Sequence, residues 1–414
     1  MKRKLKLILG NPKLIFQILF TFLILFLFKL GSTLNLPFIP VKQFGLSERR
    51  FFPIEPQKLF GLGIYPYITA SIVVQFLQKL LPICHEWKDQ GQIGKRKLNL
   101  LTRVLALLFV FGQTFAFLNN FNKVLLSPES KILSGDCFLI SLIAVAGCAI
   151  LIWFADLINS KGIGNGTSLL IIASMSGSLI SSFQELKNIF LLPMVQSFNA
   201  KEFINFIIIV LVLILFLVIT VIVQITSLKI PIHYARNQVA SQGNSYIPLK
   251  INTAGVMPLI LANALLQPFN FLTQVINNQT FNNIITYLTN IKIINFAFGL
   301  HILLIIVFSF FSTFMNVNPE EISEHLSKQD AYIAGLRPGE QTTYYLSSLL
   351  FKITVIGTLF MITLVTTPYL MDIFFGLKNM KLGGTSLLII VSVAMETIQR
   401  IMATANKKEY AKLF

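Results

Sequence analysis

The sequence is poor in charged residues, and above all in acidic ones. Charged residues make up 12% of the 414 residues, and 17 acidic residues stand against 34 basic ones. A soluble domain carries about 25% charge, whereas this chain is 54% hydrophobic. Because so few charges cannot cover a water-facing surface, the composition predicts a polytopic membrane protein. It excludes a soluble enzyme, a protein that binds nucleic acid directly and a disordered scaffold.

The chain also lacks the residues and motifs of common catalytic and metal sites. The three cysteines, Cys84, Cys137 and Cys148, have no metal-ligand spacing and form no disulfide framework, and the four histidines are scattered. No HExxH or GxSxG motif is present. The glycine-rich run Lys161–Ile171 lacks the strand and the Lys-Ser/Thr pair of a phosphate-binding loop, so we interpret it as a tight turn. We expect no metal, no cofactor, no catalytic residue and no enzyme activity.

Long apolar runs dominate the rest of the sequence. A membrane-spanning helix needs about 20 mainly apolar residues, and ten runs of suitable length are present. We predict spans at approximately 14–30, 59–80, 104–125, 137–158, 166–192, 203–227, 252–272, 293–315, 349–371 and 383–402.

The basic residues between the spans predict the topology. Ten spans place both termini on one side, and the loops of that side hold 19 Lys and Arg residues against 9 on the other. The positive-inside rule therefore places both termini inside. Ten spans also divide into two halves of five, at 1–192 and 193–414. An odd number of spans per half makes the second half inverted relative to the first, which is a common way to build a pathway at the midplane.

Two acidic residues lie near the inner ends of spans. These are Asp156 in the fourth span and Glu396 in the tenth, and Arg400 follows Glu396 at the i+4 position. An intramembrane carboxylate can indicate a functional site, but the helix-end positions and the predicted Glu396–Arg400 pair favour a structural role. No acid lies at the centre of a span, which disfavours a proton- or sodium-coupled transporter.

Two predicted spans contain a proline near a cluster of polar side chains. Pro66 lies within Gly61–Leu77 and Pro258 within Ile247–Leu266, one in each half. Broken helices are tolerated at membrane depth where the backbone faces protein or a water-filled cavity. The pattern fits a seam that can open, and equally two ordinary proline kinks in a packed bundle.

Seven runs resemble, in order and spacing, the SecY family, the channel subunit of the general protein translocase. A single run would carry little weight, but seven collinear runs with ten spans make the resemblance specific across nearly the whole chain. They read "NPKLIFQILFTFLILFLFKLGSTLNLPFIP", "LGIYPYITASIVVQFL", "GIGNGTSLLI", "YIPLKINTAGVMPLILANALL", "NPEEISEHL", "AGLRPGEQTTYYL" and "GGTSLLIIVSVAMETI".

The resemblance implies an all-α membrane protein in which two inverted five-helix halves surround an hourglass pore. It implies a ring of aliphatic side chains at the waist, which excludes water and ions but yields to a polypeptide. It also implies a lateral gate between the second and seventh spans, through which an apolar helix leaves into lipid. The aligned ring residues are Ile68, Ile72, Ile171, Met175, Ile260 and Ile389. The aligned gate residues are Thr69, Gln75, Gln113, Asn252 and Asn263.

The resemblance further implies partners. In the family, the loops after the sixth and eighth spans dock the SecA motor or the ribosome. Arg337 matches the family's loop arginine, and Arg236 and Lys250 are further candidates, for which positive-inside anchoring is an equal alternative. Other implied partners are a SecE-type subunit, a SecG-type subunit, a YidC/Alb-type insertase, unfolded preprotein substrates and membrane lipids.

Two segments depart from the family pattern. The segment that normally forms a plug is short here and carries two prolines (Val41–Ile64), and the loop "SLKIPIHYARNQ" lacks the usual dense basic cluster. Plug contacts are therefore not transferred to this chain, and docking at that loop is less well supported.

The sequence thus predicts the protein-conducting channel of a Sec translocase. A small-solute secondary transporter and a structural scaffold of a membrane complex remain as alternatives. The abundance of Phe, Ile, Leu, Asn and Lys, with only 23 glycines, is typical of an AT-rich genome. Without a recognisable transit peptide, this bias favours a plastid-encoded protein of the thylakoid membrane, with a bacterial plasma membrane as the alternative.

Overall fold

The computed structural model describes residues 11–37, 58–124, 134–187, 200–234, 246–263 with 265, 296–375 and 384–410. Within these ranges, seven helices are long and apolar enough to cross a membrane. The expectation of a helical membrane protein is therefore confirmed. The chain divides into two compact units, which are described separately. Unit 1 comprises Met1–Gln184, Leu266–Thr286 and Glu396–Phe414, and unit 2 comprises Glu185–Leu265 and Tyr287–Met395.

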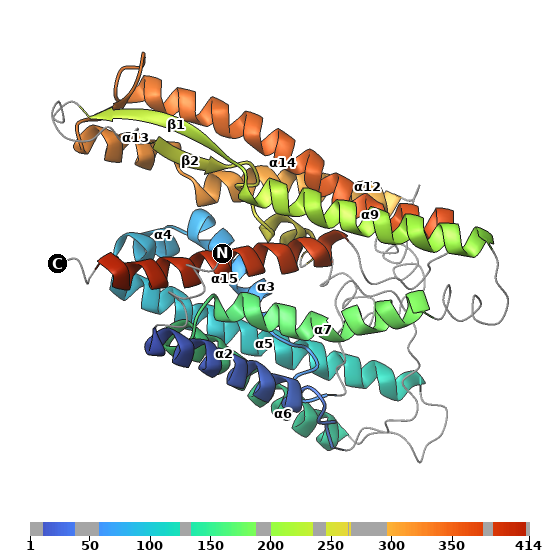
Figure 1. Cartoon of the computed structure of the whole chain (residues 1–414). Helices are drawn as coiled ribbons and strands as arrows, with labels where there is room; N and C mark the ends of the chain where they lie inside the picture. The colour runs from blue at the N-terminus through green and yellow to red at the C-terminus, as the bar shows by residue number, and fades with distance from the viewer. Residues whose placement is uncertain are drawn as a thin grey trace. The chain divides into compact units, whose positions relative to one another are not determined.

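Unit 1 is built from helices alone in the part that the structure describes (Figure 1). Three of its helices begin with a proline in the first turn, where the missing N–H would have no helical partner in any case. The elements are α2 (Pro12–Gly31), α3 (Tyr65–Leu80), α4 (Pro82–Asp89), α5 (Gln92–Val124), α6 (Ser134–Lys161), most of α7 (Gly166–Leu186) and the second half of α15 (Gly384–Tyr410).

Small side chains bring the central helices of unit 1 together. Ala70 of α3, Ala106 of α5 and Ala144 of α6 are buried in one cluster with Cys148. Small residues let helix backbones approach closely in a membrane, where van der Waals packing replaces the hydrophobic effect. Cys137 is buried in a neighbouring cluster, and both cysteines are free. They act as small core residues.

Unit 2 combines helices with a small sheet that the sequence analysis did not predict. Its elements are α9 (Ala200–Ile225), β1 (Ser227–Tyr234), β2 (Tyr246–Lys250), a short helix at 257–263, α12 (Phe296–Asn316), α13 (Pro319–Lys328), β3 (Ala331–Ile333), α14 (Glu340–Phe375) and the first half of α15. The described part of the chain is mainly helical, as expected, and the three strands add one antiparallel sheet of order β2-β1-β3.

The sheet joins two loops that are far apart in the sequence. Ile230 of β1 pairs with Ile247 of β2, and Ile232 pairs with Ile333 of β3. These side chains share one face of the sheet, because directly opposed residues in an antiparallel pair point the same way. That face packs on Leu346 and neighbouring residues of α14, as Figure 1 shows for the ribbon of β1 and β2 beside α14. The loops after α9 and after α13 therefore form one packed body.

Each predicted span overlaps a helix, but some boundaries differ. The helices α5 and α14 begin at Gln92 and Glu340, earlier than the predicted 104 and 349. Their polar first turns continue the helix beyond the apolar run, so a hydropathy count does not detect them. In the predicted span 252–272, residues 251–256 form turns and the helix begins at 257. Residues 266–272 lie outside the described part of the chain.

Candidate functional site

Four of the predicted ring residues lie in unit 1 as two pairs. Ile68 and Ile72 are one turn apart on α3, and Ile171 and Met175 are one turn apart on α7. Residues at i and i+4 share a helix face, and all four side chains are at most 8% exposed. Each helix therefore presents two buried apolar side chains, one turn apart, on one of its faces.

The other two predicted ring residues belong to unit 2. Ile389 lies on the first half of α15 and is 2% exposed. Ile260 lies on the helix 257–263 and is partly exposed. Its helix begins only after the turn at 251–256. A ring made from both units stays a prediction.

Three of the five predicted gate residues, Thr69, Asn252 and Asn263, bond within their own segments. The Thr69 hydroxyl donates to the carbonyl oxygen of Pro66 (2.9 Å), and the Asn263 amide donates to that of Leu259 (2.8 Å). Asn252 closes a turn with Gly255. Polar groups that are satisfied locally need no partner on another helix. Such a helix can move against its neighbours without leaving these buried groups unpaired.

The predicted gate residues differ in exposure. Asn252 and Asn263 are buried. Thr69, Gln75 and Gln113 are partly exposed, on α3 and α5. Their arrangement as one gate across two units stays a prediction.

The predicted docking residues are exposed where the structure describes them. Arg337 lies in the loop between β3 and α14 with its side chain exposed. Its backbone N–H donates to Gln341 Oε1 (3.2 Å), and its carbonyl oxygen accepts from the Thr342 hydroxyl (2.9 Å). The loop is thus fastened to the first turn of α14 and holds the guanidinium outward. Lys250 is exposed at the end of β2, and Arg236 lies outside the described residues.

The sheet presents a second face that the sequence analysis missed. The side chain of Lys229 lies over the Tyr246 ring at 4.8 Å, and the rings of His233 and Tyr332 are 5.9 Å apart. A weak signal for it is the alternation of Leu228, Ile230 and Ile232 with polar or small residues, which is typical of a half-buried strand but too short to distinguish a strand from a loop.

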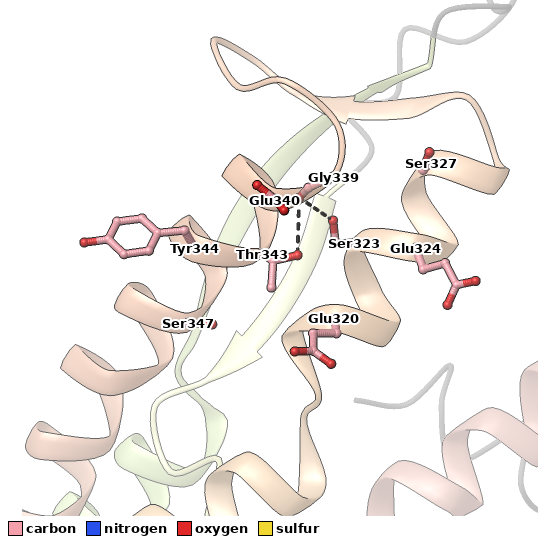
Figure 2. A pocket seen from close by; sticks show the side chains of 9 residues that line it. All are labelled: Glu320, Ser323, Glu324, Ser327, Gly339, Glu340, Thr343, Tyr344 and Ser347. Carbon is pink, nitrogen blue, oxygen red and sulfur yellow. Dashed lines mark hydrogen bonds between the residues drawn. The ribbon is translucent and has the colours of Figure 1, made fainter. Parts of the chain in front are cut away.

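An open groove of about 810 Å³ lies between α13 and the start of α14. Figure 2 shows the Ser323 and Thr343 hydroxyls converging on the carbonyl oxygen of Gly339, at 2.9 and 3.2 Å. Two of the carboxylates that line the groove are accounted for by their positions in the helices. Glu320 and Glu340 lie in the first turns of their helices, where negative charge is stabilised. The residues that line the groove are Glu320, Ser323, Glu324, Ser327, Gly339, Glu340, Thr343, Tyr344 and Ser347.

The third carboxylate of the groove belongs to a surface ion pair. Lys328 Nζ lies 2.6 Å from Glu324 Oε1. This hydrogen bond from Lys328 holds the pKa of the Glu324 carboxyl below its usual range. We assign the groove no ligand.

The two acids near the inner ends of spans are paired with arginines. Arg400 Nη2 lies 2.9 Å from Glu396 Oε1, which confirms the predicted pair, and Nη1 donates to the carbonyl oxygen of Gly164 (3.1 Å). Gly164 has φ +98° in the glycine-rich run, which confirms the predicted turn. Arg103 pairs with Asp156 at 2.7 Å. Both acids therefore have the structural contacts that the sequence favoured. In the described ranges, no cluster of three His, Cys, Asp or Glu side chains could hold a metal.

Comparison with known proteins gives the family. A family model described as SecY matches residues 58–398. The chain is 35% identical over 415 residues to the protein translocase subunit SecY of Staphylococcus epidermidis, and 36% identical over 420 residues to that of Staphylococcus aureus, in each case over 95% of both proteins.

Solved structures give the same fold. A structure of a protein-conducting channel aligns with a TM-score of 0.65 at 18% identity, over 94% of this chain and 91% of that one. Sec61 from a canine ribosome–channel complex of the endoplasmic reticulum aligns with a TM-score of 0.63 at 17% identity, over 94% and 91% of the two chains. With the match to the family model and the identity to the staphylococcal proteins, these findings show that the chain belongs to the SecY family.

Proposed function

We propose that this chain is the central channel subunit of a Sec translocase. It translocates unfolded polypeptides across the membrane and releases hydrophobic segments sideways into lipid. The observation that carries the proposal is membership of the SecY family over residues 58–398. The buried aliphatic pairs on α3 and α7 support it, because a constriction of soft apolar side chains can seal against ions and still yield to a chain.

The proposed architecture is ten spans in two inverted halves around an hourglass pore, with both termini inside. One boundary between the two compact units falls after Gln184, close to the proposed division of the halves into 1–192 and 193–414, although unit 1 also includes Leu266–Thr286 and Glu396–Phe414. The excess of basic residues in the loops on the side of the termini supports the orientation. The proposed lateral gate lies between the second and seventh spans, and burial of a signal helix in hydrocarbon, at about 0.8 kcal/mol per CH₂, drives its exit.

The transporter alternative is less well supported. A secondary transporter couples its substrate to an ion through a charged site near the midplane. Asp156 and Glu396 both pair with arginines near helix ends. The scaffold alternative predicts that no polypeptide passes through the chain, and the experiment below decides it.

The channel needs energy from partners, since we propose no catalytic residue in it. We propose that SecA drives translocation, that a SecE-type subunit holds the halves together, and that a SecG-type subunit, a ribosome or a YidC/Alb-type insertase joins them. The exposed loop with Arg337, beside the three-stranded sheet that carries Lys250, is the proposed docking platform. The relative that aligns from a ribosome–channel complex supports ribosome docking on this fold.

We also propose a location in the thylakoid membrane of a plastid. The residue bias of the sequence towards Phe, Ile, Asn and Lys supports it. The relatives that match in sequence are staphylococcal, so the bacterial plasma membrane remains the alternative. An antibody against the chain should label thylakoids in fractionated cells, and labelling of a plasma membrane would overturn this part of the proposal.

Photocrosslinking tests the channel itself. A photoreactive residue replaces Ile72 of α3 or Ile260 of the helix 257–263 in membranes that contain the partner subunit and motor. A stalled preprotein is then offered with ATP. We expect crosslinks at both positions, because both line the proposed waist. The matched control is Leu211 on α9, a hydrophobic residue that is 60% exposed and is expected to face lipid.

The outcomes separate the three functions. Crosslinks at Ile72 and Ile260 without crosslinks at Leu211 would establish a polypeptide path through the chain. A bound preprotein that crosslinks at neither ring position would overturn the channel and favour the scaffold. Ion-coupled uptake of a small solute without preprotein binding would favour the transporter.

A further inference from the structure

The seventh span begins at a turn that is closed by its own side chains. The Asn252 side chain accepts from the Gly255 N–H (3.1 Å) and donates to the Gly255 carbonyl oxygen (3.2 Å). Gly255 has φ +67°, a conformation that favours glycine. The N–H of Ile251 donates to the carbonyl oxygen of Thr226, just after α9 (3.1 Å). The turn at 251–256 is therefore compact and continuous with the sheet.

Two side chains of α12 hold this turn from outside. The Ser312 hydroxyl donates to the carbonyl oxygen of Ala254 (3.2 Å), and the Asn316 amide donates to that of Thr253 (3.4 Å). Ser312 and Ala254 are buried. A buried carbonyl group needs a donor, and the Ser312 hydroxyl on another helix provides it for Ala254. The turn is thus tied to α12 by bonds that can be broken one at a time.

Helix α14 contacts the same turn through a glycine. A Cβ on Gly357 would lie 3.1 Å from the carbonyl oxygen of Ile251 and 3.8 Å from the Asn252 Cα. Even one methyl group would push the turn and α14 apart by a few tenths of an ångström. The absence of a side chain at Gly357 therefore sets how closely the turn sits on α14.

We propose that Ser312, Asn316 and Gly357 are positioning residues that hold the base of the seventh span and set how readily the lateral gate opens. This inference rests on the proposed function, in which the seventh span forms one side of the gate. The helix after the turn begins at residue 257, and Ile260 lies only three residues, about 4.5 Å of helix rise, beyond that point. A displacement at the turn is therefore passed directly to the predicted ring and gate residues.

The bonds stabilise the observed position of the turn, so their loss favours any displaced position. A signal segment must displace the gate helix to leave the channel, and a weakly hydrophobic segment gains little by doing so. We call the bonds from Ser312 and Asn316 to the turn the clamp. Removing one of these bonds should therefore increase the translocation of preproteins with weakly hydrophobic signals much more than that of preproteins with strongly hydrophobic signals. For S312A we expect the ratio of weak-signal to strong-signal translocation to rise about fivefold, the factor that corresponds to one neutral hydrogen bond. For N316A, whose bond to Thr253 is exposed, we expect a smaller rise.

The test compares two preproteins that differ only in signal hydrophobicity, in proteoliposomes that contain the chain with its partner subunit and motor. The control is S309A, one turn earlier on α12, where the buried hydroxyl contacts Met361 Sδ (3.8 Å) and not the turn. S312T keeps the hydroxyl and should restore the ratio of the unaltered protein. A purely structural defect would lower translocation of both preproteins together.

The outcomes distinguish the clamp from the channel. A raised ratio in S312A and N316A, with S309A and S312T unchanged, supports the clamp. Equal ratios in all variants, with the strong-signal preprotein still translocated, overturn the clamp and leave the channel standing. If the unaltered protein, with partners bound, translocates neither preprotein, the proposed function fails, and the clamp fails with it.

Discussion

The second span begins against aromatic rings, whereas the seventh span begins among hydrogen bonds. Just before α3, the Phe60 ring stacks on Phe28 of α2 (6.0 Å, 3°) and meets Phe154 of α6 edge-on (6.3 Å, 75°). The turn before the helix 257–263 is held instead by Ser312 and Asn316. We call the first contact the aromatic joint and the second the polar joint. The stability of the aromatic joint comes from packed volume, while that of the polar joint comes from a few directional hydrogen bonds.

The difference indicates which of the two spans can be displaced at its starting point with the lower cost in free energy. In the predicted topology the polar joint lies at the inner face, on the side of the proposed docking loops, whereas the aromatic joint lies within the spans, between Phe28 of the first and Phe154 of the fourth. Displacing packed rings opens a cavity, at about 3–5 kcal/mol for a buried Phe, whereas breaking one buried neutral hydrogen bond costs about 1–3 kcal/mol. A force applied by a partner on the inner side would therefore act first on the polar joint, which breaks at the lower cost in free energy. Three substitutions test this difference.

The largest effect is expected for F60A. Phe60 is buried between α2 and α6, and loss of a buried Phe ring costs about 3–5 kcal/mol because it leaves a cavity. Denaturant unfolding of the purified chain in detergent measures the free energy of unfolding. F16A on α2 is the control, since Phe16 is 65% exposed and should change stability by less than about 0.5 kcal/mol. Equal losses for both variants would mean that the aromatic joint is not a packed unit.

A smaller effect is expected for N252A. This change removes both bonds between the Asn252 amide and Gly255 in a buried turn, at a cost of about 2 kcal/mol. The same unfolding measurement applies. T253A is the control, because the Thr253 hydroxyl bond to Lys250 is exposed and its loss should cost less than about 0.5 kcal/mol. A loss for N252A as large as that for F60A would remove the difference between the joints.

The smallest effect is expected for G357A, measured against G299A. Alanine stabilises a helix by up to about 1 kcal/mol relative to glycine, and a Cβ on Gly299 of α12 would meet nothing within 4 Å. At Gly357 the same Cβ crowds the Ile251 carbonyl, so the gain is cancelled. We expect G357A to be less stable than G299A by about 1 kcal/mol. Equal free energies of unfolding would show that the turn tolerates the methyl group.

Features that depend on short stretches of sequence could be predicted. The apolar runs gave the positions of the helices, because burial in hydrocarbon needs only a long apolar segment. The Glu396–Arg400 pair followed from its i+4 spacing, and the turn at Gly164 followed from its glycines. Each rests on residues that are neighbours in the chain.

Features that depend on contacts between residues far apart in the sequence could not be predicted from the sequence. The sheet needs Ile232 to meet Ile333, and the alternation in β1 is too short to decide between a strand and a loop. The turn before residue 257 depends on Ser312, 58 residues away from Ala254. The ring and gate residues were identified only through the family resemblance, because an isolated buried isoleucine looks the same in any hydrophobic core.

The three strands of the sheet can pair only in a fixed order while the chain is being synthesised. β1 and β2 are close in the sequence and can pair as a hairpin early, but residues 232–234 of β1 await β3. β3 is made about 100 residues later, after α12 and α13, which at 5–20 residues per second is roughly 5 to 20 s. During that interval one edge of β1 is unpaired, and an unpaired edge can bind any extended chain nearby. A newly synthesised copy therefore carries an unpaired strand edge until β3, which follows its eighth span, has been made.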